Sequence, residues 1–173
     1  MGSWTQDRIE ENKFINDIRI LVSSWRRGGY RGHGNITPIT RRLLEHWTNP
    51  ERERRLFFCQ IEALETAIYI AEVAKKSGDT WIKNNLNKFK DDANPLLCRQ
   101  ALKMATGTGK TVVMSMLIAW HSLNKIANPQ RREFSDTFLV VAPEITIRDR
   151  LRVIVPNDPE NYYKKLDLVP ADL

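Results

Sequence analysis

The stretch that decides the fold is ALKMATGTGKTVVMSMLIAW, residues 101–120. Gly107, Gly109, Lys110 and Thr111 stand there directly before an apolar run of helical spacing. Glycines at such a bend allow backbone conformations that aim successive N–H groups at phosphate oxygens, and the following helix adds its positive N-terminal end. In this arrangement the lysine reaches the β- and γ-phosphates, and the threonine hydroxyl holds Mg²⁺. The stretch therefore predicts a site for nucleotide phosphates and Mg²⁺ in which Lys110 and Thr111 carry the catalytic roles.

This prediction has an alternative, because the usual phosphate-loop pattern begins with a glycine where this chain has Met104. The stretch could instead be a glycine turn before an ordinary core helix, since residues 112–118 are mostly apolar. An apolar segment, a glycine loop and a long helix nevertheless follow one another in the order that a phosphate loop requires. We expect the loop to supply the nucleotide-binding residues Thr106, Gly107, Thr108, Gly109, Lys110 and Thr111.

Length and composition limit the class of protein. The chain has 173 residues, of which 42% are hydrophobic and 28% charged, so we expect a folded protein with room for one domain and a small helical appendage. Its net charge of +6 suits a polyanionic partner without requiring one. Cys59 and Cys98 stand among apolar residues, which is typical of reduced thiols in an intracellular protein. Because no signal segment or membrane span is evident, we expect a cytoplasmic location and no membrane partner.

The first ninety residues are predicted to be mainly helical. Apolar positions within 14–25 recur at helical spacing, and residues 26–35 form a glycine-rich basic loop. Thr37 and Pro38 indicate a helix start, because the threonine oxygen can cap free N–H groups and proline suits the first turn. Further helices are predicted over 56–76 and 81–89.

The second half is predicted to contain β-strands. LLCRQALKM (96–104) precedes the glycine loop, and TFLVVAP (137–143) follows the helix after that loop. An apolar strand, a crossover helix and a second apolar strand form the unit from which parallel sheets are built. The predicted fold class is therefore α/β with parallel strands, preceded by a helical region.

Several segments resemble one family of motor proteins. MATGTGKT (104–111) resembles motif I of superfamily 2 helicases and translocases, FLVVAPEITIRDRL (138–151) resembles their motif Ia, and RLFFCQIEAL (55–64) resembles their Q motif. With TPITRRLLEHW (37–47) and PNDPENYYKKLDLVPADL (156–173), the sequence is most similar to the DEAD/DEAH-box helicases related to the Res subunit of type III restriction enzymes. The resemblance implies a P-loop NTPase with an incomplete RecA-like first motor domain over 51–173 and a helical N-terminal region over 1–50.

The resemblance also implies roles for individual residues. Gln60 would read the adenine edge, with Phe57 or Phe58 packed near the base; without the resemblance, Gln60 would be interpreted as an exposed polar residue of a helix. The motif Ia segment would contact the backbone of DNA, expected to be double-stranded. The alternative for its arginines is a solvated charged face. The predicted DNA-binding residues are Pro143, Thr146 and Arg148.

Hydrolysis in this family requires an Asp-Glu pair and an arginine from a second motor lobe. The sequence contains no Asp-Glu pair. We therefore expect the N-terminal ATP-binding portion of a DNA helicase or translocase used in restriction, truncated before that motif and without turnover alone. Its expected partners are DNA, the remaining motor lobe and a restriction or modification subunit. The alternatives are a non-catalytic DNA- or partner-binding stub, a small-molecule kinase and a decayed remnant.

Overall fold

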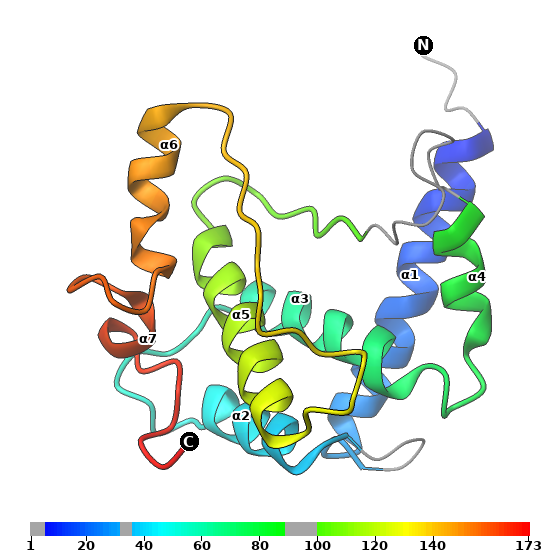
Figure 1. The fold of residues 1–173 in the computed structure, drawn as a ribbon. Helices are drawn as coiled ribbons and strands as arrows, with labels where there is room; N and C mark the ends of the chain where they lie inside the picture. Colours follow the sequence, from blue (N-terminus) through cyan, green and yellow to red (C-terminus); the bar gives the residue numbers. More distant parts are fainter. Residues whose placement is uncertain (1–5, 32–35, 89–99) are drawn as a thin grey trace. The chain divides into compact units, whose positions relative to one another are not determined.

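The computed structural model describes residues 6–31, 36–88 and 100–173 (Figure 1). The chain forms two compact units. Unit 1 comprises Met1–Asn35 and Glu65–Ala101, and unit 2 comprises Ile36–Leu64 and Leu102–Leu173. The division predicted at residue 50 stays a prediction.

Unit 1 is helical, as its sequence predicts. The apolar stripe within 14–25 lies on α1 (Gln6–Arg27), where it buries Ile18, Val22 and Trp25. Aromatic rings meet edge to face in this unit: the Trp25 and Tyr69 ring centroids lie 5.7 Å apart, and those of Phe14 and Trp81 lie 5.8 Å apart. The remaining elements are the last turn of α3 (Phe58–Ile68), the π-helical turn η1 (Tyr69–Val73) and α4 (Thr80–Lys88).

A buried carboxylate connects α1 to residue 65. The Glu65 side chain is fully buried, and Arg26 Nε donates to its two oxygens at 2.9 and 2.8 Å. The Tyr30 hydroxyl donates a further hydrogen bond of 2.7 Å to Glu65. A carboxylate can be buried only when such partners replace its water. The pair therefore holds the C-terminal end of α1 in one position within unit 1.

Unit 2 is built around α5 (Lys110–Ala127), which contacts α2 (Pro38–Thr48), η2 (Leu151–Ile154) and α7 (Tyr162–Lys165) (Figure 1). A short helix, α6 (Ile145–Arg150), precedes η2. The apolar faces of α2 and α5 supply much of the core, since the largest fully buried side chains of this unit include Leu43, Leu44, Trp47, Met116 and Trp120.

Buried hydrogen bonds fix α5 against the start of α2. Thr37 caps α2, as predicted, because its Oγ1 accepts from the Thr40 N–H at 3.0 Å. The Thr40 hydroxyl oxygen accepts from Trp120 Nε1 at 2.9 Å and from Asn124 Nδ2 at 3.0 Å. The Thr37 hydroxyl donates to Asn124 Oδ1. Because every group in this network is buried and paired, sliding α5 along α2 would leave polar groups without partners.

The end of the chain is attached to the same unit through backbone carbonyls. Arg52 Nη2 donates to the carbonyls of Leu166 and Asp167, each at 2.8 Å, and Trp47 Nε1 donates to the carbonyl of Leu168 at 2.8 Å. Burial lowers the pKa of Arg52, and the Asp167 carboxylate 3.5 Å away partly offsets this effect. Residues 166–168 are thus bound to the region around α2.

The predicted strands are absent from the described residues, so the α/β fold with parallel strands of a RecA-like domain is wrong for this structure. Of the predicted strand 96–104, residues 96–99 lie outside the described residues, and 100–104 form no strand. The backbone of 138–142 makes no hydrogen bond within the described part of the chain. The physical reason is that a strand requires a neighbour to complete its hydrogen-bond ladder, which apolar character alone does not provide.

His121 lies in an aromatic cluster of unit 2. Its ring centroid is 4.4 Å from that of Trp120, 6.0 Å from Phe134 and 6.2 Å from Phe138. Its Nδ1 is buried without a hydrogen-bond partner among the described residues. Burial lowers the pKa of His121, because the cluster disfavours the charged ring.

His121 should make the stability of unit 2 sensitive to acid. As the pH falls below the unfolded-state pKa of about 6.5, the unfolded chain takes up a proton that the folded chain resists, so the free energy of unfolding falls. We expect His121→Phe to lose less thermal stability than wild type between pH 7.5 and pH 5.5, as measured by circular dichroism. If wild type and His121→Phe lost the same thermal stability between these pH values, His121 would not be the cause of the acid sensitivity.

Removing the Glu65 charge should destabilise unit 1. Glu65→Gln leaves the Arg26 guanidinium without its carboxylate, a change that costs about 3 kcal/mol for a buried pair. Chemical denaturation followed by circular dichroism would measure the free energy of unfolding. Glu53→Gln removes an exposed carboxylate and should change the free energy of unfolding little. The buried pair would be unimportant if the two variants unfolded at the same denaturant concentration.

Candidate nucleotide-binding site

The glycine loop before α5 has the backbone conformation that its glycines allow. Gly107 has φ +81° and Gly109, the N-cap of α5, has φ +78°, both in the left-handed region that other residues adopt at a cost. A β-carbon at Gly109 would also overlap Gln60 Nε2, whereas one at Gly107 would meet nothing within 4 Å. Both glycines are therefore required by conformation, and a side chain at position 109 would in addition displace the Gln60 amide.

The loop presents a run of N–H groups that have no acceptor in the described ranges of the chain. Within the described part of the chain, the backbone N–H groups of residues 106–111 donate no hydrogen bond. Backbone donors with a partner begin after this run: the N–H groups of Val112 and Val113 donate to the Gly109 carbonyl at 2.9 and 3.3 Å. Successive free N–H groups beside a helix N-terminus form an anion-binding concavity. That this loop binds phosphate, as the sequence of residues 104–111 predicts, stays a prediction.

Lys110 lies across the loop. Its Nζ donates to the Ala105 carbonyl at 2.9 Å, and the Thr108 hydroxyl donates to the same carbonyl at 2.7 Å. The lysine is exposed, so exchanging this carbonyl for a phosphate oxygen would bury no charge. Sequence reasoning missed Ala105, because a backbone carbonyl acts independently of residue type and leaves no signal in the sequence.

Gln60 is buried beneath the loop, with 4% of its surface exposed. Its Oε1 accepts from the Phe57 N–H at 2.8 Å, and its Nε2 donates to the Thr108 carbonyl at 3.0 Å. The interpretation of Gln60 as an exposed polar residue is therefore wrong. Both ends of its amide have partners within the protein, and its predicted contact with adenine stays a prediction.

Phe57 and Phe58 lie at the start of α3, close to Gln60 in the chain. Each is 61% exposed. Neither ring is used in the core of unit 2. Both are therefore accessible to a flat ligand such as a nucleobase.

The predicted DNA-binding residues lie on a separate part of unit 2. Pro143 precedes α6, while Thr146 and Arg148 belong to that helix, and all three are exposed. Arg148 has one acidic neighbour, since its Nη2 lies 3.6 Å from Asp149 Oδ1. In the described chain, no hydrogen bond or ion pair joins these residues to the glycine loop.

Thr111 is half-buried in the first turn of α5, directly after Lys110. Of the threonine hydroxyls within residues 104–111, the one that follows the lysine stands at the position that holds Mg²⁺ in a phosphate loop. Among the described residues, no group of three or more His, Cys, Asp or Glu side chains could hold a metal ion. The described residues also contain no helix of the length and apolar character needed to cross a membrane.

Comparison with known proteins identifies the family. A family model described as "Type III restriction enzyme, res subunit" matches residues 55–167, more than half of the chain. This range contains Gln60, the glycine loop and α6. A search of curated proteins and a search of solved structures each gave no match. The resemblance stated from the sequence is confirmed: the chain belongs to the family of type III restriction enzyme Res subunits, and the matched range corresponds to a helicase-type ATP-binding motor region.

Proposed function

We propose that this chain binds ATP and Mg²⁺ at the glycine loop, as the N-terminal ATP-binding portion of a Res-like DNA helicase or translocase. The observation that carries the proposal is the run of N–H groups over 106–111, none of which donates a hydrogen bond within the described residues. A triphosphate supplies acceptors for such a run, and the positive end of α5 favours its charge. The family match supports the same nucleotide.

The residues of the loop bind different parts of the nucleotide. Lys110 exchanges the Ala105 carbonyl for the β- and γ-phosphates, and Thr106 and Thr108 flank the phosphates within the loop. The Thr111 hydroxyl holds Mg²⁺, which neutralises phosphate charge when bound. Phe57 or Phe58 packs near the base. Gln60 can read the edge of the base only if adenine replaces one of the two partners that the Gln60 amide has in the protein, the Phe57 N–H and the Thr108 carbonyl. Without an Asp-Glu pair in the sequence, we expect binding with little or no turnover.

The proposal extends to partners. Pro143, Thr146 and Arg148 are exposed around α6, where backbone N–H groups and a guanidinium can hold a DNA phosphate without reading sequence. The remaining motor lobe and a restriction or modification subunit are the proposed protein partners, in the cytoplasm. The alternative function is a non-catalytic stub that binds DNA or a motor partner. DNA binding that persists without any nucleotide binding would favour the stub.

Lys110→Ala should weaken nucleotide binding by roughly ten- to a hundredfold, the value of about 1.5–3 kcal/mol for a charge-assisted hydrogen bond. A fluorescent ATP analogue titrated in the presence of Mg²⁺ would measure the dissociation constant. Lys103→Ala, which removes an exposed lysine outside the loop, is the matched control and should bind as wild type. Indistinguishable curves for wild type and Lys110→Ala would exclude the nucleotide site.

Gln60→Ala should weaken the binding of ATP and of inorganic tripolyphosphate alike, because the amide supports the loop through the Thr108 carbonyl. Competition of each ligand against the fluorescent analogue would separate the two roles of this residue. Gln100→Ala, an exposed amide, serves as the control. A loss confined to ATP, with tripolyphosphate unaffected, would contradict the supporting role and assign Gln60 to the adenine.

A further inference from the structure

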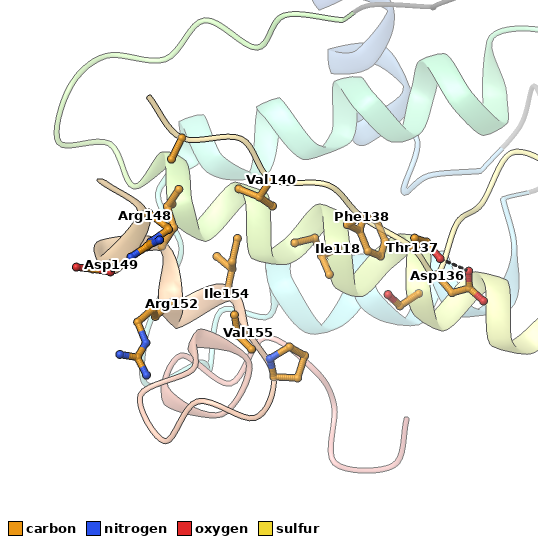
Figure 2. A pocket seen from close by; sticks show the side chains of 14 residues that line it. Ile118, Asp136, Thr137, Phe138, Val140, Arg148, Asp149, Arg152, Ile154 and Val155 are labelled. Atoms are coloured by element: carbon orange, nitrogen blue, oxygen red, sulfur yellow. Dashed lines mark hydrogen bonds and ion pairs between the residues drawn. The ribbon is translucent and has the colours of Figure 1, made fainter. Parts of the chain in front are cut away.

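A pocket of about 790 Å³ lies in unit 2 between α5, residues 136–142 and the α6–η2 segment (Figure 2). This volume falls in the range of ligand-binding pockets. Apolar side chains form most of its wall; among them are Ile118, Phe138, Val140, Ile154 and Val155. The pocket is separate from the glycine loop, none of whose residues lines it.

The segment that was predicted to be a strand forms one wall of the pocket. Phe138, Val140 and Ala142 line it, whereas Leu139 and Val141 are 90% and 81% exposed. This alternation is that of an extended chain, in which successive side chains point to opposite sides. An aromatic ring and two aliphatic side chains are thereby directed to the same pocket.

The two ends of the pocket differ in charge (Figure 2). Arg148 and Arg152 lie at one end, with side chains 70% and 72% exposed. Each has one carboxylate at the edge of ion-pair distance, Asp149 at 3.6 Å and Asp158 at 3.5 Å, and Asp149 also lines the pocket. Both guanidiniums are mostly exposed, and ion pairs of exposed side chains are weak, so a stronger anion can compete with Asp149 and with the less exposed Asp158.

Hydrogen-bond acceptors lie at the other end. Asp136 and Thr137 line the pocket there, and the Thr137 hydroxyl donates to Asp136 Oδ1 at 3.2 Å (Figure 2). Ser122 of α5 adds another hydroxyl to the lining. The pocket thus offers cations, then an apolar and aromatic wall, then acceptor oxygens.

A nucleotide of a single strand presents the complementary groups in the same order. Its phosphates are anionic, the faces of its base are apolar and flat, and the edge of its base carries N–H donors. A base in a duplex is stacked and paired and cannot enter a pocket, whereas a base in a single strand can turn out of the stack. An uncharged apolar peptide would form no ion pair with Arg148 or Arg152 and would offer few donors to the Asp136 carboxylate.

We propose that this pocket receives an unstacked base of single-stranded DNA whose phosphates contact Arg148 and Arg152. The inference rests on the proposed DNA-binding function and names the form of DNA, in place of the duplex expected from the sequence. Phe138 stacks on the base, and Arg152 joins Arg148 as a phosphate contact.

Fluorescence anisotropy with three labelled probes of equal length tests the proposal: oligothymidylate, a chain of abasic sites, and a blunt duplex. The expected result is that oligothymidylate binds roughly fivefold or more tightly than the abasic chain, which is the lower end of the effect of one base stacked on an aromatic ring. The duplex is expected to bind no more tightly than the abasic chain. Equal affinity for the abasic chain and oligothymidylate would overturn the pocket while leaving backbone binding intact.

Variants of the full chain localise the effect. Phe138→Ala should remove most of the preference for oligothymidylate over the abasic chain, and Ala142→Leu, which fills the pocket but keeps the ring, should do the same. Leu139→Ala is the matched control, because this neighbour points away from the pocket. Arg152→Gln should weaken both single-stranded probes and reduce the salt dependence of binding. An equal effect of Leu139→Ala and Phe138→Ala would overturn the assignment.

The fluorescent ATP analogue, titrated against the same samples, keeps the two proposals distinguishable. A preference for single strands with no nucleotide binding would contradict the ATP site alone. Nucleotide binding without binding of any DNA probe would overturn the pocket together with the proposed DNA contacts.

Discussion

The left-handed backbone of Gly109, packed against the buried amide of Gln60, is the constraint on which the candidate site depends. Gln60 accepts from the Phe57 N–H and donates to the Thr108 carbonyl, so it joins the start of α3 to the loop before α5. A larger residue at position 109 would have to adopt an unfavourable φ and displace that amide. With both residues in place, the chain turns into α5, and the N–H groups of residues 106–111 find no acceptor among the described residues.

Helix α5 connects this loop to the rest of unit 2. Its first residue is Lys110, its buried face contributes Met116 and Trp120 to the core, and Asn124 near its end bonds to Thr40 of α2. Ile118 of the same helix lines the pocket beside residues 136–142. The proposed nucleotide and DNA sites are therefore built on one packed helix, which is the kind of support that holds ligand-binding groups in position.

The helices and the loop could be predicted from the sequence because their signals are local. Thr37 caps its helix through a bond three residues away, and Gly107 and Gly109 mark the bend by their own conformations. The strand over 137–143 failed because pairing depends on distant segments, although its alternation is present in the pocket wall. The bond between Arg26 and Glu65, which spans 39 positions, leaves no local pattern. Predictions that fall on residues 32–35 and 89–99, including the one for Cys98, lie outside the described residues.

Nuclear magnetic resonance of the backbone amides tests the central claim most directly. Inorganic tripolyphosphate with Mg²⁺, titrated into isotope-labelled protein, should shift the amide resonances of residues 106–111 more than any others, because those N–H groups acquire phosphate acceptors. Unchanged resonances at these positions, or shifts centred on another part of the chain, would contradict the claim that this loop binds phosphate.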